Sequence, residues 1–285
     1  MPLETPCQKS ASLRRVRTHR RFAGFAAAAL FGLTLYGLLA YVLLPLAWVH
    51  YERQPRLAGR PMLTRTAADI PGDPLNIGLV GEAGDIAGAM QAIGWARADP
   101  ITVRSSLGIA RSVLMDRPDP RAPVSPLFYD GRREDLAFER ARGSSARQRH
   151  HVRLWKVLDV GAEGRSVWLG SVTYDRGVGL SADTGQVTHD IGPDIDAERD
   201  LLTQDILAAD RATSAYQVSG VGPTLAGRNG EGDPYFTDGE IEMLVLTASG
   251  APSPAVATQV DPPLRIRVKD RLLDDIKPVL RELVR

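Results

Sequence analysis

A run of uncharged residues near the N-terminus constrains this chain most. From Phe22 to Val49 no side chain is charged, and Ala and Leu dominate. At about 1.5 Å per residue, the Phe22–Leu44 core alone makes a helix of about 35 Å, enough to cross a hydrocarbon layer of about 30 Å. Trp48 stands where an interfacial aromatic residue belongs, and Pro45 marks the expected end of the regular helix. The sequence therefore predicts a transmembrane helix over 22–49.

A retained anchor explains this run better than a cleaved signal peptide does. A signal peptide has an apolar region of about 7–15 residues and a small-residue cleavage site, whereas this run is longer and has no good site. A buried helix of this length is unusual for a soluble domain. No second long apolar run follows, so we expect a single crossing of the membrane.

The charges on either side of the run predict its orientation. Residues 1–21 hold six Lys and Arg against one acid, Glu4, and fewer basic residues follow the run closely. By the positive-inside rule, 1–21 is a basic cytoplasmic tail and the body is translocated. In a Gram-negative host the body would lie in the periplasm, attached to the inner membrane. The only cysteine is Cys7, so the body needs no disulfide in an oxidising compartment.

The rest of the chain is slightly acidic. Removing the tail from the 35 basic and 34 acidic residues leaves 29 basic and 33 acidic. Nucleic-acid binding needs a basic surface that neutralises phosphates, so we expect no nucleic-acid partner. With Cys7 in the tail, a cysteine-based metal site in the body is excluded.

The pattern after the anchor predicts one α+β domain, a mostly antiparallel sheet with packed helices. Pro and Gly residues over 50–72 indicate a linker, so the domain is expected over 73–285. The expected helices are 84–96, 102–116 and 194–210, with an amphipathic tail over 269–284. The expected strands are 73–82, 215–219, 240–247, an edge strand at 264–268, and two hairpins, 125–130 with 135–141 and 151–160 with 165–175.

The densest polar cluster runs from Thr188 to Asp200. An imidazole and carboxylates at this spacing suit acid/base catalysis by His189, Asp194, Asp196 and Glu198, or a divalent metal ion held by His189 and Asp194. Helix capping is the competing explanation. Asp194 is a natural N-cap, and acids in the first turn stabilise the helix dipole.

A second cluster lies on the strand that starts at His151. On an extended strand His151, Arg153 and Trp155 share one face, which suits the binding of an anionic group. The neighbouring His150 points to the opposite face. A solvated strand face with a tryptophan at its rim is the simpler alternative.

A third candidate is the glycine-rich loop over 220–239, because loops of this length in a compact domain are often functional. Tyr235 and Asp238 are its chemically most distinctive side chains. Asp238 and Gly239 equally fit a tight turn.

Several of these segments, in this order, resemble the LssY C-terminal domain family, over roughly residues 70–250. The similar segments are Asp73–Gly81, Gly94–Trp95, Pro123–Leu127, Asp135–Phe138, His151–Trp155, Thr188–His189 with Asp194–Asp200, and Tyr235–Gly239. The family takes its name from a component of a type I secretion locus. Its domain is often fused to multi-pass membrane proteins of the phospholipid-phosphatase type. This chain has one anchor and no phosphatase domain, so the resemblance implies neither that activity nor a secretion role.

The sequence thus leads to three functional hypotheses. The first is a membrane-anchored extracytoplasmic domain that binds a partner protein of the envelope or a lipid-derived anion. The alternative is a hydrolase, metal-assisted or not, acting on a lipid-linked or phosphorylated substrate through His189 and the nearby acids. The third is a structural part of an envelope assembly.

Overall fold

The computed structural model describes residues 24–43, 52–98, 127–142, 148–180, 187–220, 226–230, 232–248 and 251–283. It divides into two units, Met1–Val49 and His50–Arg285, which are described separately. The expected helix at 102–116 lies outside the described residues.

The first unit contains one apolar helix, Gly24–Leu43, with a mean hydropathy of 1.9. Its 20 residues span about 30 Å, the thickness of a bilayer's hydrocarbon core. Thr34 Oγ1 donates to the carbonyl of Leu30 at 2.8 Å, so the hydroxyl is satisfied within the helix. The helix is long and apolar enough to cross a membrane, as predicted, while the ends of the predicted span lie outside the described residues.

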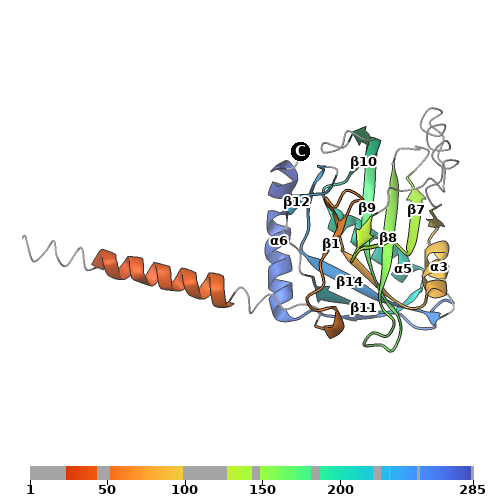
Figure 1. Ribbon diagram of the computed structural model, residues 1–285. Coiled ribbons are helices and arrows are strands. Elements are labelled where there is room, and N and C mark those ends of the chain that lie inside the picture. The colour runs from red at the N-terminus through yellow and green to blue at the C-terminus, as the bar shows by residue number, and fades with distance from the viewer. Residues whose placement is uncertain are drawn as a thin grey trace, which may run out of the picture. The chain divides into compact units, whose positions relative to one another are not determined.

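The second unit is built on a mostly antiparallel sheet (Figure 1). Its strand order is β15-β11-β14-β3-β9-β8-β7-β4, with β10 paired to β9. Only the pairs β3–β14 and β11–β15 are parallel. The strands are β3 (Ile77–Val80), β4 (Ala96–Arg97), β7 (Leu136–Ala141), β8 (Arg149–Leu158), β9 (Val167–Leu180), β10 (Val187–Ile191), β11 (Ala212–Ser219), β14 (Glu240–Leu246) and β15 (Thr258–Val260). The predicted α+β class is confirmed.

Two helices cover one face of this sheet, α3 (Ala83–Ala92) and α5 (Ile195–Ala208). Successive residues of β8 point to opposite faces of the sheet. Val152 and Leu154 therefore lie in the core under the helices. Trp155 and Val157 point into a second core on the other face.

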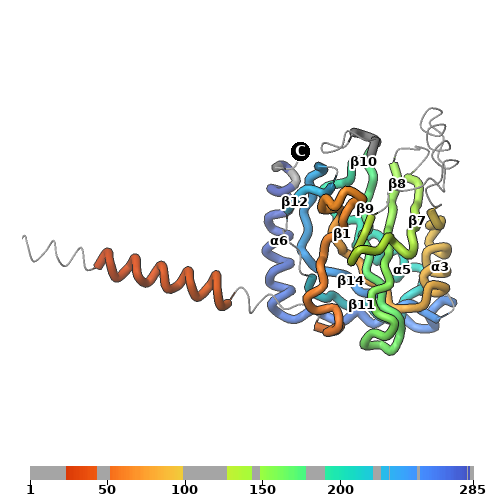
Figure 2. Tube along the Cα trace, in the orientation of Figure 1, coloured from red at the N-terminus to blue at the C-terminus, as the bar shows by residue number. Residues whose placement is uncertain are grey.

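A small sheet covers this second core, with the order β2-β1-β5-β6. Its strands are β1 (Leu63–Arg65), β2 (Pro71–Pro74), β5 (Phe128–Tyr129) and β6 (Arg132–Arg133). Figure 2 shows β1 passing in front of the main sheet and α5 lying behind it. Residues 52–72, which the sequence predicts as a linker, are part of this layer. They bury Leu57 and Met62, because their prolines and glycines shape turns between apolar residues.

Two strand predictions are wrong. Residues 127–130, the described part of the first predicted strand, do not pair with 135–141. Instead β5 and β6 form a tight hairpin whose turn has positive φ at Asp130 and Gly131, and β7 pairs with β8. Residues 264–268 begin α6 (Leu264–Leu283) rather than an edge strand. Their alternating pattern also puts Leu264 and Val268 one helical turn apart, and the following residues continue that helical period.

The predicted β8–β9 hairpin is confirmed, and its turn closes through Gly161 N, which donates to the carbonyl of Arg165 at 2.8 Å. The predicted loop at 220–239 contains a short hairpin, β12 (Ala226–Arg228) with β13 (Pro234–Phe236).

Candidate functional site

The first candidate cluster sits where α5 begins. Asp194 Oδ1 accepts a hydrogen bond from Ala197 N at 3.2 Å, so Asp194 is the N-cap that the capping explanation predicts. Pro193 precedes it and helps to stop the chain from extending the helix backwards. The Asp194 side chain thus caps the N-terminus of α5.

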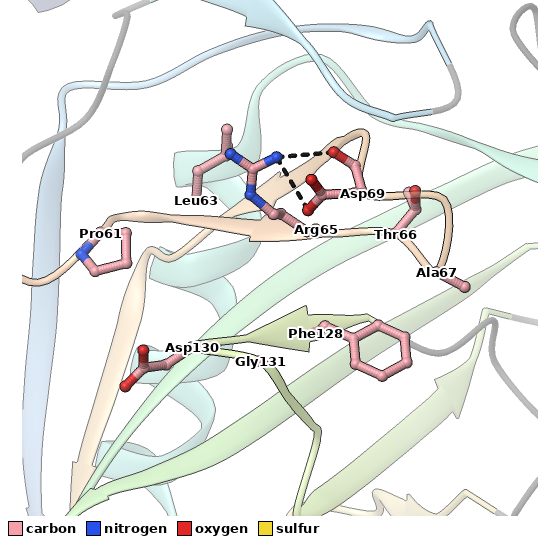
Figure 3. A pocket seen from close by; sticks show the side chains of 9 residues that line it. All are labelled: Pro61, Leu63, Arg65, Thr66, Ala67, Asp69, Phe128, Asp130 and Gly131. Carbon is pink, nitrogen blue, oxygen red and sulfur yellow. Dashed lines mark hydrogen bonds and ion pairs between the residues drawn. The ribbon is translucent and has the colours of Figure 1, made fainter.

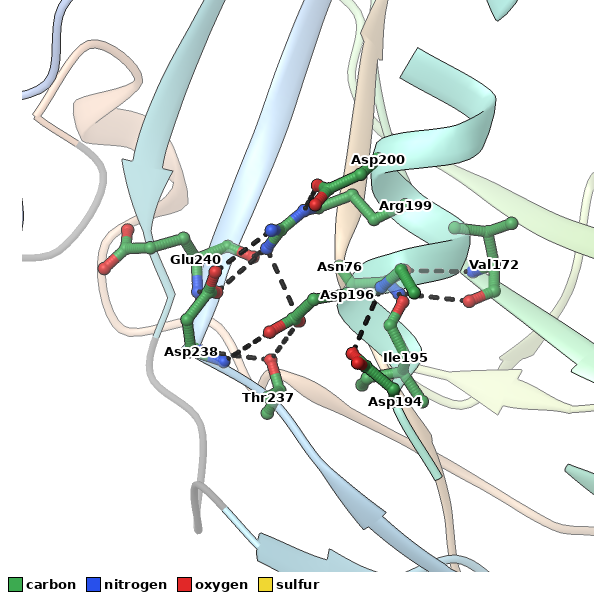
Figure 4. Close-up of polar contacts among 12 residues, drawn as sticks. Asn76, Val172, Asp194, Ile195, Asp196, Arg199, Asp200, Thr237, Asp238 and Glu240 are labelled. Carbon is green, nitrogen blue, oxygen red and sulfur yellow. Dashed lines mark hydrogen bonds and ion pairs between the residues drawn. The ribbon is translucent and has the colours of Figure 1, made fainter. Parts of the chain in front are cut away.

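Arg199 organises the acids that follow (Figure 4). Its side chain comes from α5, is 4% exposed, and donates to both oxygens of Asp238, at 2.8 and 3.0 Å. Its Nε pairs with Asp200 at 2.9 Å. Asp196 accepts from Thr237 Oγ1 and from Asp238 N, each at 2.8 Å. These bonds fasten the start of α5 to the turn between β13 and β14.

Asp196 and Asp238 are buried together beside Arg199, and this burial decides which of the two carboxyl groups is ionised. Burial, together with the charge of Asp238, raises the pKa of Asp196 to about 7 against the pull of Arg199. Burial alone would also raise the pKa of Asp238, but Arg199 beside it holds that pKa below its usual value. The pair therefore shares one guanidinium, with Asp238 as the ionised partner.

Asn76 links this cluster to the sheet, and the sequence analysis missed it. Its amide donates to the carbonyls of Val172 and Ile195, each at 3.0 Å, and accepts from Val172 N at 2.9 Å. A lone Asn inside an apolar strand was the available signal, because a buried amide must find such partners.

The second candidate cluster lies on the other face of the sheet, centred on His151. His151 Nδ1 lies 3.1 Å from Asp175, and Nε2 lies 2.6 Å from Thr173 Oγ1 and 2.9 Å from Arg153 Nη1. Because arginine only donates, Nε2 is the accepting nitrogen, which assigns the proton to Nδ1 facing Asp175. Thr173, His151 and Asp175 stand in the order of a hydroxyl–imidazole–carboxylate triad, but His151 Nδ1 makes no hydrogen bond to any described residue. Thr173 is only 1% exposed, however, and a nucleophile must reach its substrate.

Two more charged side chains complete this buried face. Arg149 pairs with Glu139 at 3.0 Å and with Asp175 at 3.2 Å. A buried ion pair of this kind is costly to break, because removing one partner leaves the other charge buried and uncompensated. Glu139 and Asp175 were not predicted, since they join Arg149 from two different strands.

The predicted anion-binding residues share one face and are buried, and several of their polar atoms contact other residues of the body. Arg153 Nη1 lies 3.5 Å from Asp73, and Trp155 Nε1 donates to the carbonyl of Arg132. Trp155 itself is fully buried in the core. His150 points to the opposite face, as predicted, and its Nδ1 lies 2.6 Å from the predicted catalytic acid Glu198.

The structure places the remaining predicted residues only in part. His189 pairs with Val178 through the backbone in the β9–β10 ladder, and its side chain lies outside the described residues. Tyr235 packs with Ile191 and Ile195 in a small apolar cluster. Among the side chains that the structure describes, no group of three or more His, Cys, Asp or Glu is placed to hold a metal ion.

A cavity of about 360 Å³ lies on the small sheet (Figure 3). Its only cation, Arg65, is paired with Asp69 at 3.2 Å, and both side chains are largely exposed. The lining residues are Pro61, Leu63, Arg65, Thr66, Ala67, Asp69, Phe128, Asp130 and Gly131. This lining offers no buried titratable group for chemistry.

Most of the exposed large apolar side chains in the described part of the body belong to α6. Its outward residues form an apolar stripe with a spacing of three or four residues: Leu264, Val268, Leu272, Ile276 and Val279. Ile266 and Leu273 are buried on the inner side, where Lys269 Nζ donates to the carbonyl of Asp238 at 2.6 Å and contacts the Glu240 carboxylate.

The first turn of α6 also meets the start of the body. Arg265 Nη2 lies 3.1 Å from Glu52 Oε1, and Glu52 also accepts from Ser219. The described part of the body begins at Glu52, so the chain enters the body beside the N-terminal end of α6.

These features define an α+β domain preceded by one candidate membrane helix. The model of the LssY C-terminus family matches residues 53–241, two thirds of the chain, and the chain belongs to this family. No curated protein and no solved structure matches it.

Proposed function

We propose that this protein is a single-pass, membrane-anchored binding domain that engages anionic lipid headgroups through α6. Its N-terminal tail lies in the cytoplasm, and its body lies on the outer side of the inner membrane. The charge asymmetry around the membrane helix supports this orientation. The exposed apolar stripe of α6 is the observation that carries the proposal.

Glu52, the first residue of the body that the structure describes, pairs with Arg265 in the first turn of α6. In the sequence, eight residues, 44–51, stand between Glu52 and Leu43, the last described residue of the membrane helix.

The chemistry of α6 suits a membrane surface. The apolar stripe exposes Leu264 at 68% and Leu272 at 61%, an arrangement that is costly in water and favourable at the boundary between headgroups and acyl chains. Arg267 and Arg271 are exposed on the N-terminal half of the helix, where Arg265 is paired with Glu52. Each basic residue near an anionic surface contributes about 1 kcal/mol. An amphipathic helix with these features is typical of interfacial binding.

The hydrolase alternative has weaker support. Asp194 caps α5, Asp196 is held by Thr237 and Asp238, and Glu198 contacts His150. Each acid thus already has an internal partner that explains its position. An envelope protein that covers the apolar stripe is an outcome of the test below.

The test measures lipid contact in the full chain reconstituted in nanodiscs. In a Cys7→Ser background, a spin label is placed at Leu272→Cys or, as control, at Gln91→Cys on α3, which lies across the body from α6 in Figure 1. We expect the label at 272 to be accessible to oxygen but shielded from a water-soluble nickel reagent, and the label at 91 to show the reverse. The contrast should be larger with phosphatidylglycerol than with phosphatidylcholine.

Equal accessibility of both labels to the nickel reagent in anionic discs would refute the lipid contact. Shielding of the label at 272 from both reagents would assign the stripe to a protein partner or a second copy and would equally overturn the proposal.

A further inference from the structure

A second cavity, of about 370 Å³, lies between α5 and the strands β11, β14 and β15. Four residues of α5 at helical spacing form one wall. The lining residues are Asp200, Thr203, Gln204, Leu207, Ala215, Gln217, Glu242, Gln259, Val260, Asp261 and Pro262. A volume of this size suits a small organic molecule.

The lining is electronegative. It holds the carboxylates of Asp200, Glu242 and Asp261, and none of the described lining residues is Lys, Arg or His. Asp200 is partly neutralised by Arg199 from behind the wall. Asp261 and, once it is ionised, Glu242 therefore provide most of the negative charge that a ligand would meet.

Two hydrogen-bonding atoms in this lining are unsatisfied within the described part of the chain. Thr203 Oγ1 has no partner although its residue is only 8% exposed, and Gln217 Oε1 has none either. A buried polar atom left without a partner costs about 1–3 kcal/mol. Such atoms in a wall call for a ligand that supplies hydrogen-bond donors.

We propose that this cavity binds an organic ammonium compound, a primary amine or diamine. Its charge pairs with Glu242 and Asp261, and its N–H groups donate to Thr203 Oγ1 and Gln217 Oε1. A bare metal ion fits less well, because the cavity is much larger than an ion and no described group of acids has metal-binding geometry. The proposal does not depend on lipid binding by α6, since none of its residues belongs to that helix.

The test titrates putrescine into the full chain by calorimetry. Phosphatidylcholine nanodiscs are used so that the diamine does not bind anionic lipid. We expect saturable binding with one site per chain. Glu242→Gln should weaken it about tenfold, as expected for the loss of a charged hydrogen bond. Thr203→Val, which keeps the shape of the side chain, should weaken it several-fold.

Asp69→Asn is the matched control, because Asp69 lines the other cavity and should leave the affinity unchanged. Cooperative thermal unfolding of each variant verifies that it is folded. Absent saturation with the wild type, or equal weakening by Asp69→Asn, would overturn the proposal. Competition by Mg²⁺ that depends on Glu242 would make the cavity a metal site instead and would also overturn it.

Discussion

The helix α5 buries charged side chains, whereas the helix α6 exposes apolar ones. The shorter helix, α5, has 14 residues and buries the charged side chains of Asp196 and Arg199 along with its apolar ones. The longer helix, α6, has 20 residues, yet its apolar stripe stays exposed. The amphipathic pattern of a helix therefore does not by itself show which of its side chains are buried. Contacts with other elements decide this, and the buried charged side chains of α5 have such contacts.

Removing the charge that holds α5 should have the largest effect. Arg199→Met leaves Asp238 and Asp196 buried without their cation, which costs about 4 kcal/mol of unfolding free energy. Urea unfolding of the full chain in micelles, followed by tryptophan fluorescence, measures it. Arg271→Ala on the exposed side of α6 should change stability by less than about 0.5 kcal/mol. A loss below about 1 kcal/mol for Arg199→Met would mean that the buried pair is not what fastens α5.

The link between α5 and the sheet should come next. Asn76→Ala leaves the carbonyls of Val172 and Ile195 and the amide of Val172 without their partner, for a cost of about 3 kcal/mol. The same urea titration applies, with the exposed Gln91→Ala as reference. If Asn76→Ala were as stable as that reference, water would have to replace all three bonds.

A smaller effect should appear in the pH dependence of stability. The pKa of Asp196 is raised to about 7 when folded, from an ordinary value of 3.8. Between about pH 4 and pH 7 the folded chain therefore keeps a proton that the unfolded chain has lost, so stability falls as the pH rises through this window. Glu240 and Glu242, also raised to about 7 mainly by burial, act in the same direction.

Asp196→Asn should make this decline shallower, by at most about 1.4 kcal/mol per pH unit, the effect of one proton. Unfolding free energies at half-unit steps from pH 5 to pH 8 give the slope. Asp69→Asn, at an exposed ion pair, should leave the slope as it is in the wild type. An unchanged slope in Asp196→Asn would show that Asp196 stays ionised throughout the window.

The smallest effect on stability should come from α6. Leu272→Ser replaces a side chain that is 61% exposed, so the unfolding free energy should change by less than about 0.5 kcal/mol. Leu202→Ala on α5, which empties a fully buried site, should cost about 2–5 kcal/mol in the same assay. Comparable losses in both variants would show that the apolar stripe is covered within the protein.

Local patterns predicted the parts of the fold that depend on neighbouring residues. The strand period put His150 and His151 on opposite faces, and the residue type of Asp194 predicted its capping role. Asp238 was noted in the sequence, but Arg199 was not identified as its partner. They meet only because β14 lies beside β3 and brings its preceding turn to α5, and no local pattern encodes that.

The same limit explains the residues that were missed. Glu139 and Asp175 face Arg149 from the strands on either side of β8, at positions that resemble solvated strand residues in the sequence. The beginning of α6 was predicted as a strand because five alternating residues fit both periods. The helical period becomes clear only beyond Val268.

The position of β3 within the sheet also sets when the body can form. β3 lies between β9 and β14, which come about 90 and 160 residues later in the chain. At about 5–20 residues per second, the ribosome needs roughly 8–30 s to make the chain between β3 and β14. Through that interval Ile77 and Leu79 have no finished sheet to join. A chain built this way stays unfolded until β14 has been made, which suits the proposed translocation of the body across the membrane before it folds.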